Sequence, residues 1–352
     1  MKPNNPHKGR GAVSNRDGRY NAVQHQAVDD GWADVDPEPA PRTQVSRETP
    51  RTLIARNQSP DIPFEQSINA YRGCEHGCAY CYARPTHAYL GLSPGLDFET
   101  KLTAKPEAAK LLRRELQRPG YRCSPIALGA NTDPYQPIER RYRITRQILE
   151  VLSEFNHPLT ITTKSALVER DLDILAPMAE KNLVQVQLSI TTLKPETARK
   201  LEPRASAPRR RLQAVTNLRD AGIPVRVMVA PVIPVLTDPE LESILQAAAE
   251  AGAVSAAYML VRLPLEVAEL FEEWLHAHFP LQADHVLNRI RDVRGGRAND
   301  PRFGHRLRGE GLFAELIAKR FRIAARRFQL DADAPPLTTD LFRGQPVQMA
   351  LF

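Results

Sequence analysis

The chain has 352 residues and a net charge of +7, and its shares of hydrophobic (42%) and charged (25%) residues are ordinary for a globular protein. This length allows one large domain or two smaller ones with a sizeable core. No apolar run approaches the roughly 18–20 residues that span a bilayer, and the polar N-terminus lacks the apolar core of a signal peptide. These features argue against a membrane or secreted protein, so we expect a cytoplasmic one.

Composition divides the chain into three regions. Residues 1–55 are expected to be a disordered N-terminal segment, because their charged and proline-rich sequence has too few apolar side chains to offset ordering entropy. Residues 60–265 alternate β-prone and amphipathic stretches and form the expected core domain. Residues 266–352 are expected to form a helical, basic C-terminal region with a disordered end.

The core region contains six short β-prone segments between helical patterns. One helical pattern places Ile144, Ile148, Val151, Leu152 and Phe155 on a single face. The expected strands are residues 68–72, 126–130, 159–163, 184–190, 225–230 and 255–261, and the expected helices are residues 108–116, 144–155, 172–181, 211–221 and 241–251.

This alternation predicts an α/β fold of parallel βαβ units with right-handed crossovers. Such units form either a doubly wound open sheet or a complete or partial barrel. In both architectures, ligands bind beyond the carboxyl ends of the strands, where the loops gather. The residues that follow each strand are therefore the candidates for function.

Three of the four cysteines, Cys74, Cys78 and Cys81, lie within eight residues after the first expected strand. Their spacing fits one helix face, but the two glycines among them favour a loop that can wrap a metal centre. Structural zinc takes four ligands from paired elements, and only Cys123 remains, with no histidine pair. An iron–sulfur cluster held by three cysteines leaves one iron open, which is typical of catalysis. The spacing favours this last interpretation.

The pattern Cys-x3-Cys-x-aromatic-Cys, with Tyr80 as the aromatic residue, resembles the signature of the radical S-adenosylmethionine (SAM) superfamily. The resemblance implies a partial (β/α)6 barrel, here with a mostly helical, basic C-terminal extension, and a [4Fe–4S] cluster on the loop after the first strand. It also implies that the open iron binds the methionine part of SAM. The reduced cluster then cleaves SAM to a 5′-deoxyadenosyl radical that abstracts hydrogen. An electron donor such as flavodoxin or ferredoxin is an implied partner.

Two further stretches carry a narrower resemblance. Residues 78–84 (CAYCYAR) and 131–137 (NTDPYQP) are similar to the spore photoproduct lyase-like, or DNA repair photolyase-like, branch. The lyase repairs a thymine dimer in DNA, and a cysteine just before its own Ser/Thr-Asp stretch is thought to donate hydrogen. Here residues 128–132 contain no cysteine. Cys123 lies upstream of that strand, and its simplest interpretation is a half-buried structural thiol.

The resemblance also implies which side chains face the amino group of SAM. Asn131, Thr132 and Asp133 follow the second strand, where superfamily members contact the methionyl ammonium, commonly through a Gly-Gly-Glu-like motif that this sequence lacks. The same Asn-Thr-Asp-Pro stretch is typical of a turn, and both interpretations are compatible.

Other candidates face the carboxylate and the adenine. Lys164 and Ser189, at the ends of the third and fourth strands, match a lysine and a serine that face the cofactor in this branch, and Lys164 could neutralise the carboxylate. The alternative for Lys164 is an ordinary solvated loop lysine. Arg204 is a further candidate partner of the carboxylate. Tyr80 would pack beside the adenine, and Tyr82 would line the site.

The carboxyl region supplies the basic excess of the chain. Residues 289–327 contain twelve Arg or Lys against four acids, a net charge of +8, and residues 294–311 are expected to be a glycine-rich loop. This charge favours an anionic partner, with nucleic acid first and a peptide or small metabolite as alternatives.

The sequence therefore predicts a lyase-like radical SAM enzyme that abstracts hydrogen from a substrate, with nucleic acid favoured. Its site would face the carboxyl rim of the barrel, capped by residues 265–340, and the sequence identifies no catalytic residue. The alternative from another class is a non-catalytic adaptor that binds nucleic acid through its basic tail and carries zinc or a cluster on the cysteines.

Overall fold

The computed structural model describes residues 6–21 and 41–344. Its main element is a seven-stranded sheet in the order β10-β9-β8-β7-β6-β3-β2, in which β3 to β10 pair in parallel and β2 pairs antiparallel with β3. The six parallel strands follow chain order, so the predicted partial (β/α)6 barrel is confirmed. The strands are β2 (Ala55–Arg56), β3 (Gln66–Ile68), β6 (Ile126–Leu128), β7 (Leu159–Thr163), β8 (Val184–Ser189), β9 (Val225–Val232) and β10 (Ser255–Leu260).

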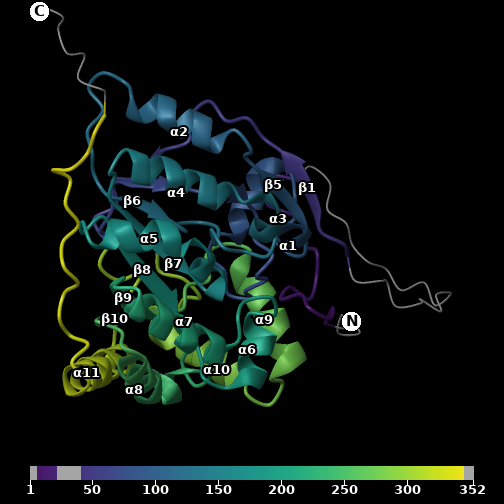
Figure 1. Cartoon of the computed structure of the whole chain (residues 1–352). Helices are drawn as coiled ribbons and strands as arrows, with labels where there is room; N and C mark the ends of the chain where they lie inside the picture. The colour runs from purple at the N-terminus through teal and green to yellow at the C-terminus, as the bar shows by residue number, and fades with distance from the viewer. Residues whose placement is uncertain (1–5, 22–40, 345–352) are drawn as a thin grey trace, which may run out of the picture.

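Helices cover the outer face of this sheet (Figure 1). Neighbouring helices pack on each other around it, α2 on α4, α4 on α5 and α7 on α8. The predicted face of α4, from Ile144 to Phe155, is buried in the main core. The crossover helices are α2 (Ala108–Leu116), α3 (Glu139–Tyr142), α4 (Ile144–Glu154), α5 (Leu172–Ala179), α6 (Pro195–Leu201), α7 (Pro208–Asp220) and α8 (Leu241–Ala251), with short 3-10 turns at Arg84–Leu90, Ala166–Asp171 and Asp238–Glu240.

The first expected strand is split between two sheets. Its start forms β3 in the main sheet, and its end forms β4 (Tyr71–Arg72). β4 joins a small sheet with β5 (Lys101–Ala104) and β1 (Gln44–Arg47), and α1 (Asp97–Thr100) leads into β5. The sequence pattern missed β1 and β5 because strands of four residues carry too little periodicity.

The N-terminal segment differs from the prediction of disorder. Residues 6–21 and 41–55 pack against the core, and Ala12 and Val13 are buried. A Cβ on Gly11 would lie 1.6 Å from the carbonyl oxygen of Gly77, so the two backbones are in contact. Order here comes from backbone contacts and buried polar groups, which a low apolar content does not reveal. The other residues of the predicted segment lie outside the described ranges.

The carboxyl region is helical and basic as predicted, but only part of it caps the carboxyl rim. Helices α9 (Val267–His278) and α10 (Ala283–Asp292) pack in a second core with the cysteine loop, and the 294–311 stretch is a loop. By contrast, α11 (Leu312–Arg327) packs outside on α8.

The end of the described chain lies at the opposite rim. Residues 331–344, drawn in yellow in Figure 1, cross the amino-terminal edge of the sheet. There the backbone N–H of Thr338 donates to the carbonyl of Asn182, and the backbone N–H of Arg343 donates to that of Phe155. The expected disordered end, residues 345–352, lies outside the described residues. Among the described helices, none is long and apolar enough to cross a membrane.

Candidate functional site

The cysteine loop, residues 73–81, runs in turns, which decides against the interpretation as a helix face. Gly73 and Gly77 have positive φ angles of 73° and 66°. A Cβ on Gly73 would lie 2.6 Å from Leu102, and a Cβ on Gly77 would lie 2.7 Å from Glu99. Both positions therefore require glycine for conformation and for space.

The thiols of this loop lie between two apolar clusters. Cys74 packs with Phe98 and Cys78 with Tyr80, while Cys81 is half-buried and contacts both clusters. Burial raises the pKa of Cys78 to about 12 and also raises that of Cys74, so a metal would have to displace their protons. None of the cysteines forms a disulfide. Three free thiols on one loop fit an iron–sulfur cluster with one open iron.

A buried ion pair between Arg84 and Glu99 supports the backbone of the cysteine loop. Arg84 donates from Nε and Nη2 to the carbonyl oxygen of Cys78, at 3.0 and 2.8 Å. Glu99 accepts the backbone N–H groups of Gly11 and Ala12, at 3.0 and 2.8 Å. The pair therefore ties the N-terminal segment to the backbone that carries the thiols.

A second set of contacts fixes the start of the loop. Gln136 accepts the backbone N–H of Glu75 at 2.9 Å and donates to the carbonyl of Gly73 at 3.1 Å. Arg204 lies 3.2 Å from the Glu75 carboxylate, and its backbone N–H donates to the carbonyl of His76. The structure thus places Arg204 against the cysteine loop, with its guanidinium on Glu75.

The carboxylate of Asp133, after β6, is held by protein groups. It accepts from the Thr163 hydroxyl at 2.6 Å and from the backbone N–H groups of Lys164 at 2.7 Å and Tyr135 at 2.9 Å. His76 Nδ1 lies 3.2 Å from it without the alignment of a hydrogen bond. Burial opposes ionisation, yet His76 and these donors lower the pKa of Asp133 to about 2. Asp133 therefore joins the ends of β6 and β7 to the cysteine loop.

Asn131 and Thr132 form the turn that their sequence indicates. Both backbone N–H groups donate to the side-chain oxygen of Asn69, at 2.9 and 3.3 Å. The Thr132 hydroxyl donates to the carbonyl of Tyr71 at 3.2 Å, so it is turned into the protein. Asn131 remains exposed beside the strand ends.

Lys164 follows β7 and lies beside the cysteine loop. Its ammonium is 5.9 Å from the ring centroid of Tyr80, and within residues 6–21 and 41–344 it has no hydrogen-bond or ion-pair partner. Burial opposes its charge, but Cys78 and Glu202 raise the pKa, which keeps the ammonium protonated. A half-buried cation of this kind is suited to bind an anionic group.

Tyr80 is buried, and its hydroxyl donates to Glu202. Glu202 also accepts from the Thr191 hydroxyl at 2.7 Å and pairs with the buried Arg211. Arg211 donates to the carbonyl of Ser189 at the end of β8, at 2.9 Å. This network therefore fixes Tyr80 and the end of β8 relative to each other.

Sequence reasoning did not pair Glu202 with Arg211. They lie nine positions apart, one after α6 and one on α7, so no local spacing marks them as a pair. Tyr80 lies in the cysteine loop, and Lys164 and Ser189 lie at the carboxyl ends of β7 and β8, with Lys164 near Cys78. Arg204 lies against the loop, with its guanidinium on Glu75.

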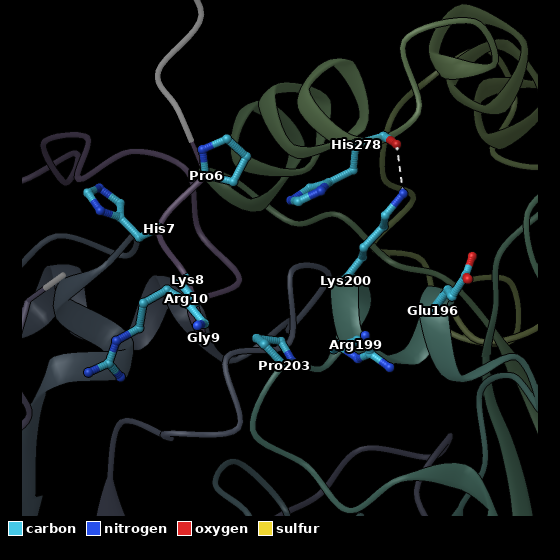
Figure 2. A pocket seen from close by; sticks show the side chains of 10 residues that line it. All are labelled: Pro6, His7, Lys8, Gly9, Arg10, Glu196, Arg199, Lys200, Pro203 and His278. Atoms are coloured by element: carbon cyan, nitrogen blue, oxygen red, sulfur yellow. Dashed lines mark hydrogen bonds between the residues drawn. The ribbon is translucent and has the colours of Figure 1, made fainter. Parts of the chain in front are cut away.

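Figure 2 shows a basic pocket, of about 370 Å³, whose lining includes Arg10 and Pro203. The residues that follow them in the chain, Gly11 and Arg204, contact the cysteine loop. Figure 2 shows the N-terminal segment facing α6 across it, with Lys200 donating to the carbonyl of His278. No cysteine or strand-end residue described above lines it. The lining residues are Pro6, His7, Lys8, Gly9, Arg10, Glu196, Arg199, Lys200, Pro203 and His278. Its cations outnumber the single acid, Glu196.

Comparison with known proteins identifies a matching family, related sequences and similar structures. The sequence profile of the radical SAM superfamily matches residues 68–248. An uncharacterised protein of Mycobacterium tuberculosis is 39% identical over 304 residues, 85% of this chain and 86% of the relative. An uncharacterised protein of Methanocaldococcus jannaschii is 26% identical over 222 residues, 63% of this chain and 79% of the relative. Spore photoproduct lyase complexed with dinucleoside spore photoproduct aligns with a TM-score of 0.58 and 16% identity, over 81% of this chain and 79% of that chain.

A partial barrel with three free cysteines after its first strand is the arrangement of an iron–sulfur enzyme. The profile match extends over half of the chain, and the chain belongs to the radical SAM superfamily. Its cofactors are a [4Fe–4S] cluster and SAM. The likeness to spore photoproduct lyase is a likeness of fold. The non-catalytic adaptor is not favoured.

Proposed function

We propose that this protein is a radical SAM enzyme that abstracts hydrogen from a nucleic-acid substrate in a lyase-like reaction. One observation carries the proposal of radical SAM chemistry. The ammonium of Lys164 has no ion-pair partner among the described residues, and it lies at a strand end beside three free thiols. The net charge of +8 in residues 289–327 supports a nucleic-acid substrate. The fold shared with spore photoproduct lyase, solved with a dinucleoside photoproduct, supports the same class.

In this proposal Cys74, Cys78 and Cys81 hold the [4Fe–4S] cluster. When bound and reduced, the cluster supplies the electron that cleaves SAM to methionine and a 5′-deoxyadenosyl radical. Arg84 and Gln136 hold the backbone of the loop that carries these thiols.

The strand ends hold SAM. Lys164 binds the methionyl carboxylate, because a cation without a protein partner gains most from an anion. Tyr80 packs beside the adenine, Ser189 lines the cofactor at the end of β8, and Asn131 faces the methionyl ammonium.

The remaining candidates act as positioning residues. The Asp133 carboxylate receives three hydrogen bonds from the protein and orients the backbone of Lys164. Thr132 anchors the turn that presents Asn131, and Arg204 steadies the cysteine loop through Glu75.

The hydrogen-donating cysteine of the lyase has no counterpart here. Residues 128–132 lack cysteine, and Cys123 precedes β6, whereas the candidate site follows it. Burial raises the pKa of Cys123 to about 12, so it stays a thiol, and its position before β6 is what argues against it as the hydrogen donor. The proposal therefore covers radical generation and hydrogen abstraction and does not include the final step of the lyase.

A radical SAM enzyme needs an electron donor, and we propose an acidic carrier such as flavodoxin or ferredoxin. The basic pocket beside the cysteine loop supports this choice, since Lys8 and Arg199 are exposed on it. Lys8→Glu and Arg199→Glu should slow product formation driven by flavodoxin but not by dithionite, which needs no docking. Lys319→Glu on α11 is the matched control, and equal slowing with dithionite would contradict this docking site.

The test of the enzyme itself is anaerobic. The reconstituted protein is reduced with dithionite and given SAM, and 5′-deoxyadenosine is measured against the Cys74/Cys78/Cys81 triple-alanine variant. Product from the wild type alone supports the proposal, and damaged DNA and RNA are then screened as substrates. A colourless protein with bound zinc and no product would refute it in favour of the adaptor.

A further inference from the structure

Arg262, two residues after β10, carries a guanidinium without a partner. The side chain is partly buried, and within the described ranges it makes no hydrogen bond or ion pair; its Nε is buried and unsatisfied. The guanidinium carbon lies 5.9 Å from the ring centroid of Tyr82, the residue after Cys81. Arg262 therefore stands at the opening of the barrel beside the cysteine loop.

A neighbouring arginine, Arg294, shows the contacts that a structural guanidinium makes in this fold. Arg294 is fully buried, and it donates to the carbonyls of Leu260, Val261, His305 and Arg306 at 2.6 to 3.2 Å. Arg294 therefore ties the 294–311 loop to the end of β10.

Arg262 has no such carbonyl acceptors, although it lies close to the same loop. The four N–H donors on its two Nη atoms remain available to a ligand.

The charges around Arg262 leave an excess of positive charge. Burial lowers the pKa of Arg262, and the nearby cation of Arg306 lowers it further. Arg306 is itself paired with Asp61 at 2.7 Å, so the only described carboxylate acting on Arg262 is already engaged. An anion between Arg262 and Arg306 would relieve their repulsion and satisfy the free donors.

Aromatic side chains flank the same opening. Gly304 donates its backbone N–H to Asp61 at 2.7 Å, so the 294–311 loop reaches from β10 to the connection between β2 and β3, across the two edges of the sheet. Phe303 on this loop is 58% exposed, under the guanidinium of Arg306, and Tyr82 is 46% exposed. Two exposed rings beside two cations suit a base attached to a phosphate.

We propose that Arg262, together with Arg306, binds a phosphate of the substrate, and that Tyr82 and Phe303 hold the attached base. The ligand class is one nucleotide of a single-stranded or unstacked nucleic acid. This inference rests on the proposed function and deepens it, because it places the nucleotide beside Cys81, where the cluster would be held. The hydroxyl of Tyr82 donates to the carbonyl of Ala130, which follows β6, and its ring lies 5.9 Å from the Arg262 guanidinium, so the nucleotide would lie beside the strand end that we propose for the cofactor.

The test measures binding of a fluorescein-labelled single-stranded DNA 12-mer to the reconstituted protein by anisotropy. Arg262→Gln should weaken binding at least tenfold, and Arg322→Gln, an exposed arginine on α11, should weaken it less than twofold. Arg262→Lys keeps the charge but loses the two-pronged donor geometry, so it should fall between wild type and Arg262→Gln. Thermal melting of each variant confirms folding.

A competition experiment isolates the phosphate. Thymidine monophosphate should displace the 12-mer from wild type better than thymidine does, and Arg262→Gln should remove this advantage. Equal binding by Arg262→Gln and wild type, or no binding of the 12-mer by wild type, overturns the inference. The formation of 5′-deoxyadenosine by wild type without any nucleic acid tests the proposed function separately, so the two failures are distinguishable.

Discussion

Replacing Glu202 with glutamine tests the buried network behind the candidate SAM site. The carboxylate accepts from Tyr80 and Thr191 and pairs with the buried Arg211. Glutamine keeps the shape and can still accept both hydroxyl hydrogen bonds, but it removes the charge. Arg211, which is 1% exposed, is then left without its counter-ion.

The size of the effect follows from that unpaired charge. Removing one partner of a buried ion pair costs about 3–5 kcal/mol. A chain of 352 residues has an unfolding entropy of about 0.7 kcal/mol/K, so Glu202→Gln should lower Tm by about 4–7 °C at pH 7.

The pH dependence has a definite sign. Burial opposes ionisation of Glu202, but Arg211, Lys164 and the hydroxyl donors lower its pKa from 4.5 to about 2. A lowered pKa in the folded state adds stability that is complete above pH 4.5 and is lost as the pH falls toward 2. The Tm difference between wild type and Glu202→Gln should therefore be equal at pH 7 and pH 6 and narrow only below about pH 4.5.

Scanning calorimetry of the anaerobic, reconstituted proteins measures these differences. Arg211→Met and the double variant complete a cycle, and the double variant should recover at least half of the loss, because no uncompensated charge remains. A Tm for Glu202→Gln within 1 °C of wild type, on the order of 0.7 kcal/mol, would refute the network as a source of stability. Losses that simply add in the double variant would refute the coupling of the two side chains.

Three more variants probe the loop and the strand ends. Gly77→Ala should at least halve iron per chain in a colorimetric assay, because its Cβ would lie 2.7 Å from Glu99 at a φ of +66°. Lys164→Ala should keep its iron yet bind SAM at least tenfold more weakly in calorimetric titration, since one charge-assisted hydrogen bond contributes about 1.5–3 kcal/mol. Asp133→Ala should weaken SAM binding and also lower Tm, since it removes three internal hydrogen bonds; a Tm equal to that of Lys164→Ala would contradict its positioning role.

The parts of the fold that the sequence predicts are those with strong periodicity. Helix α4 buries every third or fourth residue, and strands β7 and β8 bury every second residue. The predicted ends of these elements lie within about one residue of the observed ends. The small sheet lacks this property. β5 has four residues and β4 two, so pairing between segments, rather than their own pattern, forms it.

The residues of the candidate site also fall into two groups, those that a local sequence pattern marks and those that it does not. The cysteines and Lys164 could be selected because a local motif or a strand end marks them. Arg262 also follows a predicted strand, and the rule of examining the residues after each strand would have found it. Glu202 and Arg211 could not be found in this way, since their pairing depends on how α6 and α7 pack behind the strand ends.

The N-terminal segment shows why composition misjudged order. Its residues bury little apolar surface, yet Glu99, which is fully buried, needs hydrogen-bond donors, and the backbone of Gly11 and Ala12 supplies two. Glu99 also binds Arg84, which holds the carbonyl of Cys78. The segment is thus part of the support of the cysteine loop, and its order follows from a polar group elsewhere in the chain. A composition rule that scores a segment by its own residues has no access to that partner.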